Sequence, residues 1–165
     1  MADKMLNALQ LLAEDHRKVE QLFEKFGSAR GAAAQQKIVQ QLCEELTIHT
    51  MIEEEIFYPA LRGKIEDDLL NEAMVEHDGA KTLVLDLKSA APDEAYYTAK
   101  VTVLQEQIEH HIREEEKQRE SIFAQARKAD VDLDRLGEQL MARKQELRQL
   151  AQQGGLPDPK MEAVG

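Results

Sequence analysis

Two short motifs of this sequence place a histidine four residues before a glutamate. One runs from His49 to Glu53, and the other runs from His111 to Glu115. On a helix, side chains four residues apart lie one above the other on the same face. Each motif therefore presents an imidazole nitrogen and a carboxylate side by side, which is the kind of donor pair that transition metals bind.

Two further histidines stand alone, and each directly follows an acidic residue. His16 precedes His49 of the first motif by 33 residues, and His77 precedes His111 of the second by 34 residues. The chain therefore repeats one arrangement, a lone histidine followed by a His-x-x-x-Glu motif. We expect two helical hairpins related by a pseudo-two-fold axis, which brings both halves to the centre of one bundle.

The elements that must position these residues are helices. Strong helix formers dominate the chain, glycine and proline are scarce, and the alternation typical of strands is absent. Apolar residues recur at steps of three and four over about residues 4–26, 33–62, 65–89 and 92–128. Short connections between long amphipathic helices make neighbouring helices antiparallel. We therefore predict an all-α fold, an antiparallel up-down-up-down four-helix bundle with an additional C-terminal helix.

The chain after the bundle divides into a helix and a tail. We assign residues 1–128 to the bundle, 129–152 to a C-terminal amphipathic helix, and 153–165, which are rich in glycine and proline, to a flexible tail. The leucine stripe of the helix, from Leu133 to Leu150, must be buried. It packs on the bundle as a fifth helix or pairs with another chain to form a dimer. We favour packing within the chain.

In each of the four long helices, polar residues interrupt the apolar face at one level only. The interrupting residues are one histidine per helix and two motif glutamates: His16, His49, Glu53, His77, His111 and Glu115. Burying them costs free energy unless a partner compensates them, and no lysine or arginine lies beside them on these faces. A metal cation is the predicted partner, and mixed nitrogen and oxygen donors suit iron, manganese or zinc. The alternative is a polar core in which the histidines are only hydrogen-bonded.

Other polar and reactive residues near the motifs are expected to have different roles. His110 lies about 100° around the helix from His111 and should point to the surface. We interpret Tyr58 first as packing at the end of the bundle, with a place near the site as the alternative, and Cys43 as a small buried or half-buried filler rather than a redox switch. Solvated surface positions are expected for the other glutamates of the motifs, Glu54, Glu55, Glu114 and Glu116.

Composition limits the partners and the location of the protein. Its 165 residues contain 21 Lys and Arg against 32 Asp and Glu, a net charge of −11. Such a chain is repelled by nucleic acid and by anionic membranes, so we expect neither as a partner. No segment has the roughly 18 to 20 apolar residues that cross a bilayer, and the N-terminus is unlike a signal peptide. With a single cysteine, the sequence favours a cytoplasmic protein without internal disulfides.

At the two motifs the chain resembles the hemerythrin family, specifically its HHE cation-binding branch. Residues 49–59, HTMIEEEIFYP, resemble the first family signature almost position for position, and residues 111–116, HIREEE, resemble the second. The resemblance extends over about residues 5–128. It implies a non-haem centre of two iron ions joined by oxo or hydroxo and carboxylate bridges, with Glu53 and Glu115 as the bridging carboxylates. The ligands that it implies are His16, His49, Glu53, His77, His111 and Glu115.

Two departures from the family pattern bear on function. Ala73 occupies the position of a fifth histidine ligand in the oxygen carriers, and the second carboxylate is Glu115 where the carriers have aspartate. Reversible oxygen transport is therefore not the expected role. We expect a protein that binds or senses dioxygen, peroxide or nitric oxide in stress response or iron handling, rather than an enzyme. A di-iron enzyme that consumes peroxide or nitric oxide and a metal-stabilised interaction or storage module stay open as alternatives.

Overall fold

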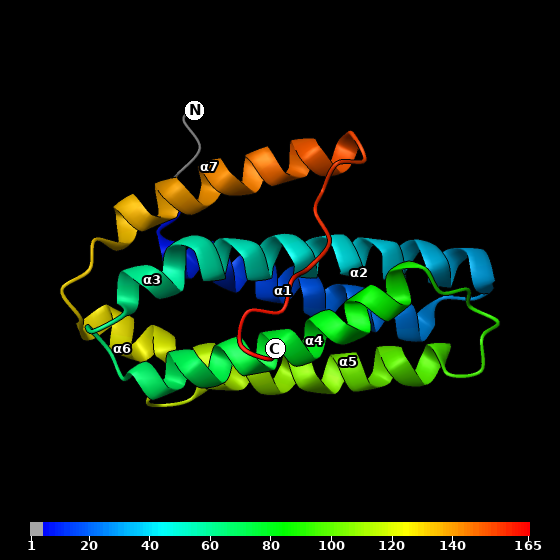
Figure 1. Ribbon diagram of the computed structural model, residues 1–165, viewed down its shortest axis with the longest axis horizontal. Coiled ribbons are helices and arrows are strands. Elements are labelled where there is room, and N and C mark those ends of the chain that lie inside the picture. The colour runs from blue at the N-terminus through cyan, green and yellow to red at the C-terminus, as the bar shows by residue number, and fades with distance from the viewer. Residues whose placement is uncertain (1–4) are drawn as a thin grey trace.

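The computed structural model describes residues 5–165, and no strand occurs among them. The chain forms the predicted all-helical bundle with an additional C-terminal helix (Figure 1). The elements in chain order are α1 Ala8–Ser28, α2 Ala32–Ile52, the π-helix η1 Glu53–Phe57, α3 Tyr58–Leu61, α4 Asp67–Lys88, α5 Tyr97–Ile112, the π-helix η2 Arg113–Lys117, α6 Ile122–Lys128 and α7 Leu133–Gln152.

Four long helices form the bundle, and several begin or end at a recognisable signal. Asn7 caps α1 by accepting the N–H of Gln10, whose side chain in turn accepts the N–H of Asn7. Gly31 and Gly63 take positive φ values of 93° and 75° in the turns after α1 and α3, a conformation that glycine adopts at low cost. In this arrangement α1 packs against α2, α2 against α4 and α4 against α5, so the four histidine-bearing helices surround one centre.

The fourth predicted helix, residues 92–128, is shorter and broken in the structure. The segment at Pro92 forms turns, in which the Glu94 carboxylate accepts the N–H of Ala91, and α5 begins only at Tyr97. At the other end the helical backbone stops after η2. Ser121 then caps α6 by accepting the N–H of Ala124. A proline followed by acidic residues is typical of a helix start. Here, however, the Glu94 side chain stabilises a turn that precedes the helix, and it does not cap the first turn of α5.

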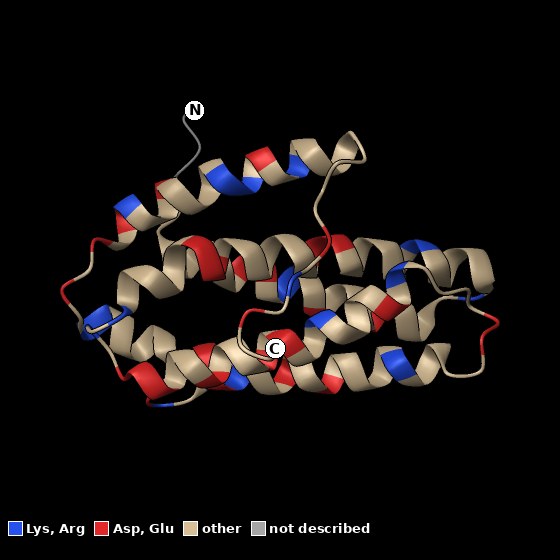
Figure 2. Cartoon of the chain, viewed as in Figure 1, with Lys and Arg blue, Asp and Glu red and all other residues tan. Residues whose placement is uncertain are grey.

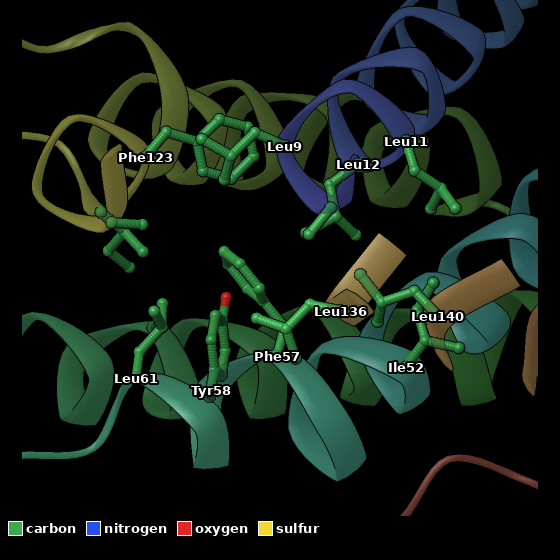
Figure 3. Close-up of a cluster of buried hydrophobic side chains, with 14 of the residues drawn as sticks. Leu9, Leu11, Leu12, Ile52, Phe57, Tyr58, Leu61, Phe123, Leu136 and Leu140 are labelled. Atoms are coloured by element: carbon green, nitrogen blue, oxygen red, sulfur yellow. The ribbon is translucent and has the colours of Figure 1, made fainter. Parts of the chain in front are cut away.

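The apolar core is divided into two clusters by the layer of histidines and glutamates. One cluster contains Ile52, Phe57, Leu61 and Phe123, and Figure 3 shows these side chains meeting those of α1 and α7. The second cluster lies on the opposite side of the polar layer and is formed by residues such as Leu42, Leu46, Val84, Leu104 and Ile108. The polar layer is thus enclosed by apolar side chains above and below, which keeps bulk water out.

Helix α7 lies along α1 and α2, so its leucine stripe is buried within the chain (Figure 1). Leu140 and Leu147 are fully buried. Gly137 lets the helix approach α1 closely, because a Cβ atom at this position would overlap the backbone oxygen of Leu6 and lie 2.8 Å from the carbonyl carbon of Asn7. Backbone atoms cannot move aside as a flexible side chain can. The close approach of α7 to α1 therefore depends on glycine at position 137.

Replacing Gly137 with alanine is expected to lower the free energy of unfolding by about 2 kcal/mol, since overpacking displaces α7. Gly79→Ala is the matched control. Gly79 is helical and exposed, and an added Cβ there meets only the Gln107 side chain at 3.8 Å. That variant should gain about 0.5–1 kcal/mol from its better helix propensity. Urea unfolding of both variants measures the difference, and equal stabilities contradict the packing argument.

The segment after α7, residues 153–165, crosses from the end of α7 over α2 and ends against α4 (Figure 1). Its backbone and Pro159 contact the bundle. The flexibility expected for this segment stays a prediction. Separately, none of the helices among the described residues combines the length and apolar character needed to span a bilayer.

Candidate metal centre

The structure brings all six predicted ligand residues together in the middle of the bundle. Their donor atoms form two groups of four, and within each group all the atoms lie within 4.8 Å of one another. His16 and His49 belong to the first group, and His77 and His111 belong to the second. Glu53 and Glu115 belong to both groups and are fully buried. Two carboxylates shared between two pairs of histidines is an arrangement that suits two adjacent metal ions.

The inner contacts follow the repeat seen in the sequence. His49 Nε2 lies 2.9 Å from a Glu53 oxygen, and His111 Nε2 lies 3.2 Å from a Glu115 oxygen, so each motif closes on itself. Each glutamate also reaches the other half of the chain. The contacts join His77 Nε2 to Glu53 at 3.4 Å and His16 Nε2 to Glu115 at 3.3 Å. Both carboxylates therefore lie between a histidine of one half and a histidine of the other.

Several inner atoms lack hydrogen bonds, and they show whether the residues fit a metal. Among residues 5–165, buried atoms without a hydrogen-bond partner include Nε2 of His16, Nε2 of His49, both oxygens of Glu53 and one oxygen of Glu115. Buried polar atoms are almost always paired, and each exception needs an explanation. All of these atoms are metal donors aimed at the same centre, so the residues fit a pair of metal cations.

The outer nitrogen of every histidine in the cluster is held by a carboxylate. The Nδ1 contacts are His16 to Glu116 at 2.8 Å, His49 to Asp15 at 3.1 Å, His77 to Glu54 at 2.6 Å and His111 to Glu76 at 2.9 Å. A carboxylate that accepts the Nδ1–H fixes the ring and leaves the Nε2 lone pair free for a metal. All four rings are therefore oriented with Nε2 toward the centre.

Each outer carboxylate is paired in turn with a cationic or ionisable side chain. Asp15 accepts a hydrogen bond from Lys144 of α7, Glu54 lies 2.7 Å from Lys81, and Glu116 lies 3.1 Å from Arg17. Figure 2 shows basic residues interspersed with acidic ones along α7. The fourth carboxylate, Glu76, lies 3.2 Å from exposed His110. These pairs hold the outer carboxylates in place.

Solvated surface positions were expected for the four other motif glutamates, and this expectation is wrong for two of them. Glu54 and Glu116 are not merely solvated, because they hold His77 and His16. Glu55 lies near the surface, where it pairs with Arg143 of α7. Glu114 pairs with His110, which points outward as predicted. The sequence carries no local sign of these roles, since the contacts join residues far apart in the chain.

Without metal, the imidazoles of His49 and His111 hold their protons more strongly than a free imidazole does. Burial lowers the pKa of His111, but the Glu115 and Glu76 carboxylates outweigh it and raise that pKa to about 10. The pKa of His49 is likewise raised well above its ordinary value, against burial, by Glu53 and Asp15. Burial raises the pKa of Glu115, but contacts with Glu53, His111 and His16 bring it well below the usual range. A metal must therefore displace protons from these imidazoles when it binds.

The backbone switches from α to π geometry at both motifs. η1 begins at Glu53, directly after α2, and η2 contains Glu115, directly after α5. A π turn accommodates one extra residue and is frequent at functional sites. At η1 the Tyr58 N–H donates to the Glu53 carbonyl, an i→i+5 bond. The turn therefore changes which side chains follow Glu53 on the inner face.

Tyr58 packs in an apolar cluster, as first interpreted, but its hydroxyl also reaches the site, which was the alternative. The side chain is buried, its hydroxyl donates to Glu115, and the hydroxyl oxygen lies 3.3 Å from His77 Nε2. Figure 3 shows the ring pointing into the bundle with the hydroxyl at its tip. In an unbroken α-helix Tyr58 lies about 140° around from Glu53, which is why the periodicity did not predict this position. The π turn rotates it inward.

The chain is similar to known proteins in both sequence and structure. The hemerythrin HHE cation binding domain family matches residues 7–120. The crystal structure of a hemerythrin HHE cation binding domain-containing protein from Mycobacterium kansasii, the Rv2633c homolog, superposes with a TM-score of 0.74 at 25% identity, over 92% of this chain and 95% of that one.

A curated relative carries the same kind of region within a longer protein. A DNA nickase of Nostoc sp. (strain PCC 7120) is 27% identical over 111 residues, 67% of this chain but 32% of the nickase. The chain therefore spans about a third of the length of that relative. The family match covers most of the bundle, including every histidine and glutamate of the central cluster. The chain thus belongs to the hemerythrin HHE cation-binding domain family.

Proposed function

We propose that this protein holds two iron ions at the central cluster and uses them to bind or sense dioxygen, peroxide or nitric oxide. The observation that carries the proposal is the sharing of Glu53 and Glu115 between two pairs of histidines. A pair of redox-active ions bound there would supply electrons and a binding position for a small molecule. Manganese or zinc also suits nitrogen and oxygen donors, and elemental analysis distinguishes them.

The residues of the chain prepare the site for that role. His16, His49, His77 and His111 would hold the metals through Nε2, and the two buried glutamates would lie between them. The outer carboxylates fix the rings, and their lysine and arginine partners fix the carboxylates. The apolar clusters on both sides exclude water. Such an enclosed site admits small molecules and excludes large ones.

The oxygen carriers have a fifth histidine where this chain has Ala73. We propose that the Tyr58 hydroxyl occupies the space that the missing imidazole leaves. Ala73 and Tyr58 belong to the same apolar cluster, and the Tyr58 hydroxyl lies at the histidine pair of the second donor group. Burial and the Glu115 and Glu53 carboxylates raise the pKa of Tyr58 well above its ordinary value, so the phenol keeps its proton. It can therefore donate a hydrogen bond to Glu115 or to a small molecule beside it.

Replacing Tyr58 with phenylalanine should leave metal content unchanged and weaken nitric oxide binding to the reduced, iron-loaded protein about tenfold, the value of one good hydrogen bond. Phenylalanine keeps the ring in the core, so the loss of stability should be limited to that of one buried hydrogen bond, about 1–3 kcal/mol. Optical titration measures the affinity. An unchanged affinity and spectrum would assign Tyr58 to packing alone. Phe57→Leu, in the same segment but without a polar group, is the control for repacking.

The experiment that tests the proposed function is exposure of the reduced, iron-loaded protein to each small molecule in turn. A sensor or binder gives a stable spectral change with one equivalent, whereas an enzyme consumes many equivalents of peroxide or nitric oxide. Spectral indifference to all three contradicts the proposal and favours a metal-stabilised storage or interaction module.

The nickase activity of the longer relative is not part of the proposal. The chain covers 32% of that protein, and its own net charge of −11 disfavours contact with phosphates. We also propose a location in the cytoplasm, on the basis of the single cysteine.

A further inference from the structure

The last residues of the chain form a strap, residues 156–164, tied to α4 through backbone groups. The buried Asp78 carboxylate accepts N–H groups from three consecutive residues, Glu162 at 3.0 Å, Ala163 at 2.7 Å and Val164 at 2.7 Å. Lys81 donates to the carbonyl of Lys160 at 2.7 Å. A buried carboxylate dedicated to successive backbone amides of one segment indicates that the strap has a defined seat on α4.

The strap covers a narrow gap between α2, α4 and α5. Pro159 is the buried residue of the strap, and behind it remains a cavity of only about 10 Å³. The walls of this cavity are Leu46, Thr47, Thr50, Ala80, Lys81, Val84 and Ile108. This volume is barely enough for one water molecule. Pro159 therefore closes the gap as a plug.

The gap lies within one helical turn of three histidines of the proposed metal centre. Thr50 follows His49, Ala80 lies three residues after His77, and Ile108 lies three residues before His111. On helices these steps are one turn or less. Three of the four histidine-bearing helices thus line the gap within one turn of their histidine. Most of the lining is apolar, which suits the passage of small neutral molecules.

We propose that the strap is a gate, which opens to admit small neutral molecules to the centre through this gap. Residues 162–164 are exposed, and polar contacts to Asp78 and Lys81 tie the strap down. Segments held by few apolar contacts open at low cost while the core stays folded. The strap can therefore lift without unfolding the bundle. The purpose of the gate rests on the proposed function, but the opening of the strap can be measured without metal.

Cys43 provides a native reporter of strap opening. It is the single cysteine of the chain, it is buried, and its Sγ lies 3.7 Å from the carbonyl oxygen of Val84, a residue of the gap wall. Together with Leu156 and Pro157 of the strap it lines a pocket of about 310 Å³. Reaction of Cys43 with methyl methanethiosulfonate, a small neutral reagent, therefore reports how often the strap is raised.

The first test compares Cys43 labelling in three full-length variants. Asp78→Asn weakens the seat of the strap, and Pro159→Gly removes the plug; both should label about tenfold faster than the parent chain. Asp86→Asn is the matched control, since Asp86 is an exposed carboxylate of the same helix that pairs with Lys100. It should label at the parent rate. Parent-like rates in both strap variants overturn the proposal.

The second test measures passage through the gap itself. In a Cys43→Ser chain, Ala80→Cys places a thiol on the wall of the gap, and Pro159→Gly should speed the labelling of that thiol about tenfold. This measurement needs no metal. In the iron-loaded protein, Pro159→Gly should raise the association and dissociation rates of nitric oxide together, with the affinity unchanged.

The two tests separate the gate from the proposed function. If the protein cannot be loaded with metal, the proposed function fails, whereas faster labelling of the thiol in the gap still supports the gate. Unchanged labelling of that thiol sinks the gate whatever the metal content.

Discussion

Replacing Glu53 with alanine is expected to lower the bound metal from about two ions per chain to fewer than about one, because shared carboxylates serve both ions. Glu53 is fully buried, and both of its oxygens lack a hydrogen-bond partner among the described residues. Its removal takes a donor from each of the two groups at once. His49→Ala, which removes a donor from one group only, should cost less metal than Glu53→Ala.

The control for this series is His110→Ala. His110 is exposed and absent from both buried donor groups, although its neighbour His111 belongs to one of them. Metal content in this variant should match that of the parent chain. Elemental analysis of the three purified variants decides the matter, and an equal loss of metal in all three contradicts the ligand assignment.

Removal of metal should lower the thermal midpoint by about 10 °C or more. At a free metal concentration about a thousandfold above the dissociation constant, binding stabilises the folded state by about 4 kcal/mol. In a domain of this size about 1 kcal/mol shifts the midpoint by roughly 2–4 °C. The physical cause is local: without metal, the fully buried Glu53 and Glu115 have only the neighbouring imidazoles to compensate their charge. Calorimetry with and without a chelator measures the shift, and identical midpoints contradict the account.

The metal-free protein should lose stability at both ends of the pH range. The pKa of His111 is raised in the folded state from 6.5 to about 10. Its contribution to stability is therefore complete below about pH 6.5 and is lost as the pH rises toward 10. The pKa of Glu115 is lowered well below 4.5, so its contribution is present above about pH 4.5 and lost as the pH falls. Urea unfolding of the metal-free protein across this pH range measures both losses, and a flat profile contradicts them.

Near neutrality, the affinity for metal should depend on pH in the opposite sense to the His111 contribution to the stability of the metal-free protein. Imidazoles must be deprotonated to bind metal, so metal affinity should rise as the pH increases from about 6 to about 8. Proton release on metal addition, measured in weak buffer, checks this directly. Binding without proton release contradicts the assignment of His49 and His111 as ligands.

The bundle and the convergence of the six polar residues could be predicted from the sequence because both depend on helical period. His49 and Glu53 are four residues apart on one face, and the same holds for His111 and Glu115. The helical period places the histidines and glutamates on the inner face of each helix. Because the same arrangement occurs in both helical hairpins, these residues also lie at one level of the bundle. Whether these residues bind metal stays a prediction that the variants above test.

The sequence could not predict features that depend on a change of helical period or on contacts between residues far apart in the chain. Tyr58 reaches the site through the π turn at η1, which shifts the face by one residue. Lys144 steadies Asp15 from 129 residues away, and Arg17 meets Glu116 from 99 residues away. Such partners depend on how helices pack, which single-chain periodicity does not encode. The strap on Asp78 is likewise a contact across 84 to 86 residues.

The metal content of the intact protein is the decisive measurement for the proposed di-iron centre. The protein is produced with iron, purified without chelator and assayed by elemental analysis. We expect about two irons per chain, held by the cluster around Glu53 and Glu115. A folded protein that contains no metal and resists reconstitution would contradict it and would leave the four histidines as a hydrogen-bonded polar core.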